Sequence, residues 1–281
     1  MLIAPGQKRP GLTNCSSLRL LIRFALLVIA FARGACPARA EDCPTSTDEI
    51  ATDRPDVTNS SLVVPLHSVQ AENGADWAVR HASNSLEASN TRLRAGIAHC
   101  TEFLIDIPSY FGSLNGSQHS GFSNIVISLK RQLPVPFGID LSATAGMGFP
   151  LGSGNISGPG YQPYIQFPWS HSVADDWAVT GMFTMAWYPS DPVRNPTFEP
   201  TLSLEKDFGP AADLFVEYVG DYSHQRPSQL LDGGGSWRFT KTQQLDFHVG
   251  FGLNSNTVDH YFGIGYSIRL DHVWGVASGN S

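Results

Sequence analysis

Hydrophobic and polar residues alternate along many short stretches of the chain. In residues 139–149 (IDLSATAGMGF), 245–253 (LDFHVGFGL) and 262–270 (FGIGYSIRL), every second residue is apolar and the residues between them are polar or glycine. This period of two places successive side chains on opposite faces of an extended strand, so each stretch predicts a β-strand with one apolar face. Less regular stretches, among them 92–98 (RLRAGIA) and 236–240 (SWRFT), raise the total to about twelve predicted strands.

The connections between the predicted strands alternate between short and long. Short connections include 98–101 (AHCT) and 133–138 (LPVPFG), whereas long ones include 112–121 (GSLNGSQHSG), 151–160 (LGSGNISGPG) and 223–233 (SHQRPSQLLDG). The long connections are rich in Gly, Ser, Asn and Pro, which favour turns and loops. Bacterial outer-membrane barrels alternate in the same way, with short turns at one rim and long loops at the other.

Two further features favour a membrane barrel over a soluble β-sandwich. The polar face of the predicted strands carries many charged side chains, and aromatic residues such as Trp77, Trp177, Tyr188 and Trp237 gather at strand ends, as in the aromatic girdles of outer-membrane barrels. A sheet in lipid must close on itself, because lipid offers no hydrogen bonds to an open strand edge. The sequence therefore predicts an all-β protein, a transmembrane antiparallel β-barrel of about 12 strands, at residues 62–271.

The first 40 residues differ from the rest of the chain. They hold six basic residues and no acidic residue, an apolar run (FALLVIAFA) after Arg23, and Ala38-Arg39-Ala40 before Glu41. This order describes a secretory signal peptide, and the apolar run is too short for a transmembrane helix. We therefore expect residues 1–40 to be a signal peptide cleaved near Ala40, with an uncleaved anchor as the alternative.

Removal of that leader would change the charge and the cysteine content of the chain. The full chain has 18 basic and 25 acidic residues, so losing six basic residues takes the formal net charge from −7 to −13. Such an acidic chain argues against nucleic acid as a partner. Cys43 and Cys100 would be the remaining cysteines, and an even pair in an exported protein suggests one disulfide, with two free thiols as the alternative. No spacing of Cys or His suggests a metal, and we expect no cofactor.

Residues 52–74 (TDRPDVTNSSLVVPLHSVQAENG) resemble the start of a family of bacterial transporter-like proteins named after the meta-pathway of phenol degradation. Its members share a T-D-R-P-D-x-T motif followed by a V-P-x-G-x-x-Q-x-E-x-G first strand, and Leu66-His67 stands here where the family tends to have a glycine. Further matches are 121–133 (GFSNIVISLKRQL), 158–170 (GPGYQPYIQFPWS) and 215–222 (FVEYVGDY). The residues that match the two motifs are Thr52, Asp53, Arg54, Pro55, Asp56, Thr58, Val64, Pro65, Gln70, Glu72 and Gly74.

The resemblance runs from about residue 52 to about residue 271 and implies an outer-membrane β-barrel that is channel-like. It implies the outer-membrane bilayer, the barrel-assembly machinery and a small-molecule solute as partners. The family name does not establish phenol as a substrate or any catalysis.

Asp53, Arg54 and Asp56 surround Pro55 in a segment, 41–61, that has no hydrophobic period. One interpretation leaves this segment in solvent as an N-terminal tail, and the other places it inside the barrel as a plug or constriction. The resemblance favours the inside position. The strands would then contribute seven more charged residues to the lumen, either as ion pairs that fill it or as solute contacts: Glu72, Arg92, Arg94, Glu102, Asp106, Glu217 and Arg238.

We therefore expect a channel for passive passage or binding of small molecules, with aromatic or hydrophobic compounds as candidates and residues 272–281 as a C-terminal tail. One alternative is a structural or anchoring barrel without transport. Another is an outer-membrane lipid hydrolase with His248 as its base. The alternation places His248 on the lumen face, whereas such hydrolases carry their Ser and His on the lipid-facing side, and the chain has no G-x-S-x-G motif, so we expect no enzyme.

Overall fold

The structure, a computed structural model, describes residues 43, 45–81, 83–115, 119–157, 160–188, 196–223 and 227–275. The predicted signal peptide and the end of the predicted C-terminal tail, residues 276–281, lie outside the described residues. Among the described residues, no helix is long and apolar enough to cross a membrane.

Almost all regular structure in this part of the chain is β-strand. The elements are β1 (Val69–Arg80), β2 (Ser83–Ala98), β3 (Thr101–Ile107), β4 (Tyr110–Ser113), β5 (Gly121–Phe122), β6 (Ile125–Leu133), β7 (Ile139–Phe149), α2 (Gly154–Ser157), β8 (Gln162–Ala174), β9 (Trp177–Ala186), β10 (Thr197–Asp207), β11 (Ala212–Asp221), β12 (Ser228–Thr240), β13 (Gln243–Gly252) and β14 (His260–Leu270).

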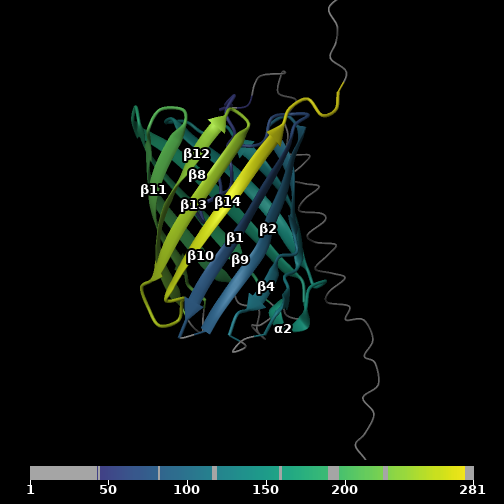
Figure 1. Ribbon diagram of the computed structural model, residues 1–281. Helices are drawn as coiled ribbons and strands as arrows, with labels where there is room; N and C mark the ends of the chain where they lie inside the picture. Colours follow the sequence, from purple (N-terminus) through teal and green to yellow (C-terminus); the bar gives the residue numbers. More distant parts are fainter. Residues whose placement is uncertain are drawn as a thin grey trace, which may run out of the picture. The chain divides into compact units, whose positions relative to one another are not determined.

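Twelve of the described strands, β1 to β3 and β6 to β14, form a closed antiparallel β-barrel (Figure 1). The barrel closes because β1 pairs with strands on both sides: Val69 lies opposite Leu270 of β14 and opposite Ala95 of β2. The short strands β4 and β5 continue the wall beside β2. This arrangement confirms the predicted transmembrane barrel of about 12 strands.

The barrel wall is apolar outside and polar inside, which is the reverse of a soluble protein. On the outer face, Phe183 and Val216 have 61% and 57% of their surface exposed. On the lumen face, Arg94, Glu102 and Glu217 are each 0% exposed. This distribution fits a wall whose outer face contacts lipid and whose inner face contacts other polar groups and water.

Two strands are longer than the sequence pattern predicted. The stretch 223–233 was expected to be a loop, but β12 begins at Ser228 and continues through Gly233, Gly234 and Gly235. These glycines pair on both sides, and a Cβ at Gly234 would lie 2.2 Å from the backbone oxygen of Phe247. The glycine run therefore permits close approach of neighbouring backbones and does not end the strand.

β2 likewise begins at Ser83 and not near Arg92. Its first half has only two apolar residues, Leu86 and Ala88, which is too few for a clear period of two. It nevertheless pairs with β1 and with β4. Neighbouring strands on both sides supply the backbone hydrogen bonds that local sequence does not predict.

The connections define two different rims of the barrel. The chain turns tightly after β2, β6, β8, β10 and β12, at the rim where β1 begins and β14 ends, drawn uppermost in Figure 1. The opposite rim carries the longer loops and α2, except that a tight connection joins β1 to β2. In outer-membrane barrels the short turns face the periplasm and the long loops face outward, so we name the two rims the short-turn rim and the long-loop rim.

Close to the start of β1, the backbone of His67 has φ of 66°, in the left-handed region. Glycine adopts this conformation at no steric cost, whereas other residues adopt it rarely. The family motif has its glycine at this point, so the departure from the motif at Leu66-His67 retains a glycine-like backbone.

Candidate functional site

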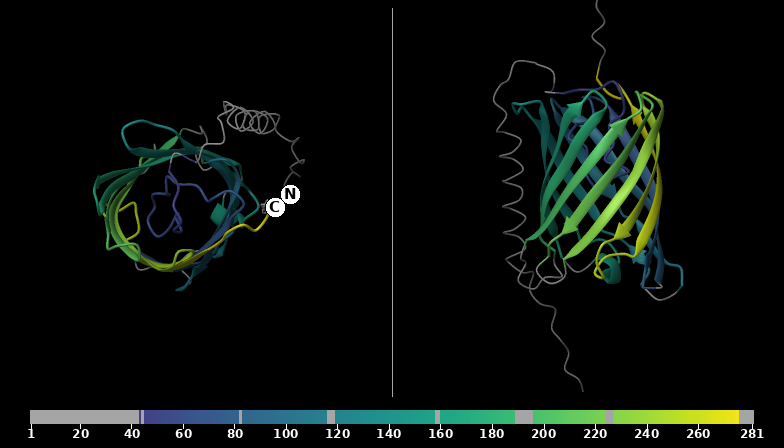
Figure 2. Two further views of the ribbon diagram at one scale, coloured as in Figure 1. Left: turned by 90° about the horizontal axis from the view of Figure 1, so that it is seen from above. Right: turned by 90° about the vertical axis from the view of Figure 1, so that its left-hand side faces the viewer.

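The chain enters the barrel at the short-turn rim before it forms β1, and the left view of Figure 2 shows it crossing the interior of the ring. A disulfide joins Cys43 to Cys100, in the turn between β2 and β3, with a Cα–Cα distance of 5.2 Å. At the same rim, Ile50 N donates to Lys241 O at 2.7 Å, and the guanidinium of Arg269 donates to the backbone oxygen of Asp48, also at 2.7 Å. We call residues 50–64, which follow these contacts, the lumen segment.

Asp53 of the lumen segment lies among three cations of the wall. Its carboxylate oxygens lie 3.0 Å from Arg92 Nη1, 3.3 Å from Arg94 Nη1 and 3.2 Å from Lys130 Nζ. Burial alone would raise the pKa of Asp53, but the charges of Arg94, Lys130 and Arg92 outweigh burial and hold the pKa below its usual value of 3.8. Asp53 is therefore a buried anion compensated by the wall of the barrel.

Arg94 is the cation that connects most of this cluster. Its guanidinium lies 2.9 Å from Glu102 of β3 and 2.9 Å from Glu72 of β1. It also donates to the backbone oxygens of Ala51 and Leu62, at 3.0 and 3.1 Å. One fully buried arginine thereby holds three strands and both ends of the lumen segment together.

Carboxylates of the wall also accept hydrogen bonds from the backbone of the lumen segment. Glu72 accepts from Asp53 N at 2.9 Å, and Glu102 accepts from Val64 N at 2.7 Å. On the opposite side, Glu217 of β11 accepts from the backbone nitrogens of Val57 and Thr58 at 2.7 and 2.9 Å. Buried N–H groups require partners, and here strands on different sides of the barrel supply them.

Arg54 is held less completely than Asp53. Its guanidinium lies over two glycines, since a Cβ at Gly74 or Gly265 would lie 2.3 Å from Cζ and 2.6 Å from Nε of Arg54, respectively. Its Nη2 is 3.4 Å from Asp246 Oδ1 and 3.4 Å from Ile264 O, and its buried Nε has no hydrogen-bond partner in the described part of the chain. The absence of side chains at Gly74 in β1 and at Gly265 in β14 leaves room for the guanidinium of Arg54. That guanidinium is bound to the wall only by long polar contacts.

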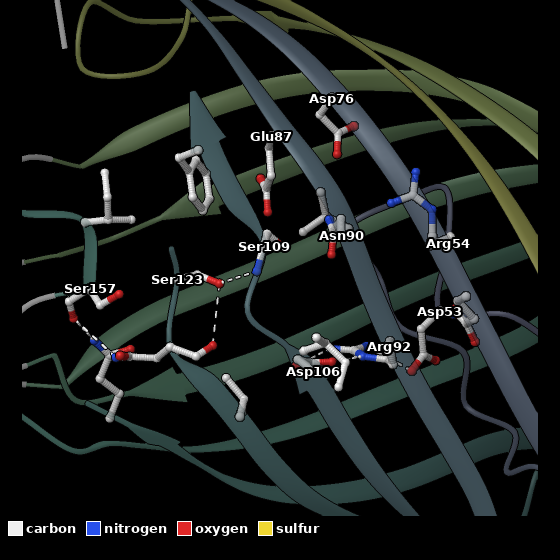
Figure 3. Close-up of a pocket in the computed structure, with 18 of the residues that line it drawn as sticks. Asp53, Arg54, Asp76, Glu87, Asn90, Arg92, Asp106, Ser109, Ser123 and Ser157 are labelled. Carbon is white, nitrogen blue, oxygen red and sulfur yellow. Dashed lines mark hydrogen bonds and ion pairs between the residues drawn. The ribbon is translucent and has the colours of Figure 1, made fainter. Parts of the chain in front are cut away.

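Two cavities lie on the two sides of the lumen segment. The outer cavity, toward the long-loop rim, has a volume of about 980 Å³ and is shown in Figure 3. The inner cavity, toward the short-turn rim, has a volume of about 250 Å³. Both cavities are lined by the same four residues of the lumen segment: Arg54, Pro55, Asp56 and Asn59.

The remaining predicted site residues fall into three places. Asp106 lies 2.6 Å from Arg92 and belongs to the Asp53 cluster, as the dashed lines of Figure 3 show. Asp56 is half-buried, and burial, followed by repulsion from Glu217, raises its pKa well above the usual value. Arg238 lies apart from the cluster and pairs with Asp213 at 2.6 Å.

Sequence reasoning left Asp246 and Asn59 out of the candidate set. The alternation in 245–253 places Asp246 on the polar face, so a signal for its lumen position exists. Asn59 lies in an aperiodic segment that gives no such signal, yet its Oδ1 accepts from Arg92 Nη1 at 3.0 Å. Tyr188, expected in the aromatic girdle, lies beyond the last residue of β9, donates to Glu199 at 2.7 Å and lines the outer cavity.

His248 lies on the lumen face, where the alternation places it. Its Nε2 is 2.7 Å from Asp76 Oδ1 and its Nδ1 is 3.5 Å from Asp232 Oδ2. Both partners are carboxylates, and the ring packs edge-on against Tyr261. Within the described ranges, no group of three or more His, Cys, Asp or Glu side chains has the arrangement of a metal site.

Comparison with solved structures finds barrels of the same fold. An outer membrane channel from Pseudomonas putida F1 shares 12% identity with this chain at a TM-score of 0.57, and the match covers 75% of this chain and 98% of the channel. The NanC porin shares 8% identity at a TM-score of 0.51, with 72% of this chain and all of the porin covered. At these identities the likeness is one of fold.

Comparison with curated proteins finds no match. A family model does match, over residues 52–270, which extend from the Thr52-Asp53-Arg54-Pro55-Asp56 motif of the lumen segment to the last residue of β14. The chain therefore belongs to the family described as "Putative MetA-pathway of phenol degradation".

Proposed function

We propose that the protein is an outer-membrane channel for passive passage of small molecules, and that the lumen segment forms its constriction. The observation that carries this proposal is the pair of cavities. They lie on the two sides of the lumen segment, and among its residues Arg54, Pro55, Asp56 and Asn59 line both. A solute that crosses the barrel passes these side chains.

The size and chemistry of the outer cavity support small solutes. Its volume of about 980 Å³ lies at the upper end of the range of about 300–1,000 Å³ that is typical of small-molecule pockets. Phe111, Tyr188 and Ile156 add apolar and aromatic surface to a lining that also contains charged and neutral polar side chains. The family's description, which names phenol degradation, makes small aromatic compounds the first solutes to test.

The contacts that anchor the lumen segment favour the interpretation that it is a fixed constriction, and not a disordered tail. Asp53, Arg94 and Glu102 are buried and joined by ion pairs of 3.4 Å or less, and buried pairs of this kind hold a geometry because breaking them leaves an uncompensated charge. By contrast, the guanidinium of Arg54 makes its polar contacts with the wall at 3.4 Å. The constriction thus combines a firm anchor with one loosely held side chain.

The test is conductance of the purified, refolded protein in planar bilayers, together with flux of phenol into liposomes that contain it. A channel gives discrete ion steps and solute flux above that of protein-free liposomes. A refolded barrel, verified by heat-modifiable gel migration, that gives neither steps nor flux is a structural or anchoring barrel, and the proposal fails.

A further inference from the structure

Acidic side chains outnumber basic ones along the path that the two cavities define. The outer cavity is lined by two arginines, Arg54 and Arg92, and by six carboxylates. The inner cavity is lined by Arg54 and Arg238 and by four carboxylates. The outer carboxylates are those of Asp53, Asp56, Glu72, Asp76, Glu87 and Asp106.

The arginines on this path are already neutralised by acids of the protein. Arg92 lies between Asp53 and Asp106, as Figure 3 shows, at 3.0 and 2.6 Å. Arg54 pairs with Asp246, and Arg238 pairs with Asp213. A passing anion would therefore have to compete with a carboxylate of the protein for each of these cations.

Five carboxylates along the path have no arginine or lysine partner. In the part of the chain that the structure describes, no Lys or Arg lies within 4.0 Å of Asp56, Asp76, Glu87, Asp140 or Glu205. Asp76 has one basic partner, the imidazole of His248. We call these five residues the carboxylate row.

The carboxylate row extends through the barrel. Asp76 and Glu87 line the outer cavity, and Asp56 lines both cavities at the constriction. Asp140 and Glu205 line the inner cavity. Moreover, Asp76 and Glu87 are direct cross-strand partners on β1 and β2. Two like charges in directly opposed positions destabilise a sheet. The pairing of Asp76 with Glu87 on the lumen face therefore lowers the stability of the barrel.

Rings or rows of Asp and Glu side chains select cations in membrane pores. From the compensated arginines and the carboxylate row, we infer that this channel passes cations in preference to anions, and that its organic solutes are small neutral or ammonium compounds and not aromatic carboxylates. This inference rests on the proposed channel function and goes further by assigning the charge of the solute and the residues that select it.

The test is the reversal potential of the full-length protein in a planar bilayer under a gradient of potassium chloride. We expect K⁺ to be more permeant than Cl⁻ by roughly fivefold, the factor that one unit charge at contact distance provides in water. Glu87→Gln, Asp56→Asn and Glu205→Gln should each lower this ratio, and the triple variant should bring it to about one. The matched control is Asp48→Asn, which removes an acid whose side chain is 88% exposed outside both cavities.

Replacing potassium by benzylammonium, and in a separate experiment chloride by benzoate, compares aromatic ions of similar size and opposite charge. Benzylammonium should carry current and benzoate should not. Ion steps whose reversal potential is zero, or has the sign expected for a channel that prefers chloride, would overturn the inference. They would leave the channel function intact. Absence of any ion steps would overturn both. The sign of the reversal potential is measured on the wild-type protein, so the inference can be tested even if a variant fails to fold.

Discussion

Asp53 Oδ1 lies 3.3 Å from Arg94 Nη1, and neither side chain has more than 1% of its surface exposed. One residue belongs to the lumen segment and the other to β2, so this ion pair joins the segment to the wall. Because neither charge can reach water, each depends on buried partners of opposite charge, including the other, for compensation. The pair explains why a segment without hydrophobic period has a fixed place inside the barrel.

Replacing Asp53 by Asn should release the lumen segment, because three cations would lose their shared anion. We expect the free energy of unfolding to fall by about 3–5 kcal/mol, the usual cost of breaking a buried pair, and channel currents to become larger and noisier. Urea unfolding in detergent micelles and bilayer recordings measure the two effects. Asp48→Asn, which removes an exposed partner of Lys241, is the control and should change neither. Equal stability of the two variants would refute the anchoring role of Asp53.

Replacing Gly74 by Ala should narrow the constriction. The new Cβ would lie 2.3 Å from Arg54 Cζ, and because the wall is closed behind it, the flexible guanidinium must move toward the lumen. We expect lower conductance with unchanged heat-modifiable migration. The same substitution in an Arg54→Ala background is the control and should have no effect on conductance. A fall in conductance that persists without Arg54 would contradict the explanation.

The lumen segment should stay docked in mildly acidic solution. The pKa of Asp53 lies below its usual value of 3.8, so its stabilising contribution is present above that value and is lost only as the pH falls further, toward the lowered pKa. Hydrogen exchange of the amides of residues 53–64, followed by mass spectrometry, should show constant protection from about pH 8 to about pH 5. Loss of protection within that range would show that Asp53 is not compensated as described.

Cation preference should strengthen as the pH rises. Burial, with repulsion from Glu217, Glu205 and Asp213, raises the pKa of Asp56, so this carboxyl ionises later than an exposed aspartate and adds its charge only at higher pH. The K⁺/Cl⁻ permeability ratio of wild-type protein should therefore go on increasing above the pH range in which an exposed aspartate ionises. Asp56→Asn should remove this increase, and an identical pH dependence in the variant would exclude Asp56 as its source.

Reducing the Cys43–Cys100 disulfide should loosen the chain where it enters the barrel. The bridge closes a loop between residues 57 positions apart, and closing such loops contributes about 2–4 kcal/mol in typical cases. Cys43→Ser should therefore lower the unfolding free energy by up to that amount while the barrel still forms. Alkylation of both cysteines in unreduced, folded protein would show that the bridge is absent.

The wall of the barrel could be predicted from the sequence because it has a strict period. In residues 245–253, alternation is enough to place Phe247 toward lipid and His248 toward the lumen. Prediction failed at Ser83 and at Gly233, where β2 and β12 already pair with their neighbours. There the backbone hydrogen bonds of adjacent strands determine the structure, and the local sequence resembles a loop.

The interior was less predictable than the wall. The family motif pointed to Asp53 and Arg54, but no local pattern shows that Asp53 lies against Arg92, Arg94 and Lys130 on two separate strands. Such contacts depend on barrel closure, which joins residues far apart in sequence. The sequence also did not predict why the lumen face has glycine at positions 74 and 265. The reason is the guanidinium of Arg54, which lies over Gly74 and Gly265 and leaves no room for a side chain.

The most direct test of the account compares the conductance of the full-length chain with that of a chain lacking residues 51–61. The barrel should still form, because its strands pair independently of this segment and its lumen charges would then contact water. With the residues that line both cavities removed, we predict larger and steadier ion steps, and weaker discrimination between K⁺ and Cl⁻. A correctly folded deletion variant with the same conductance as the full-length protein would contradict the claim that the lumen segment forms the constriction.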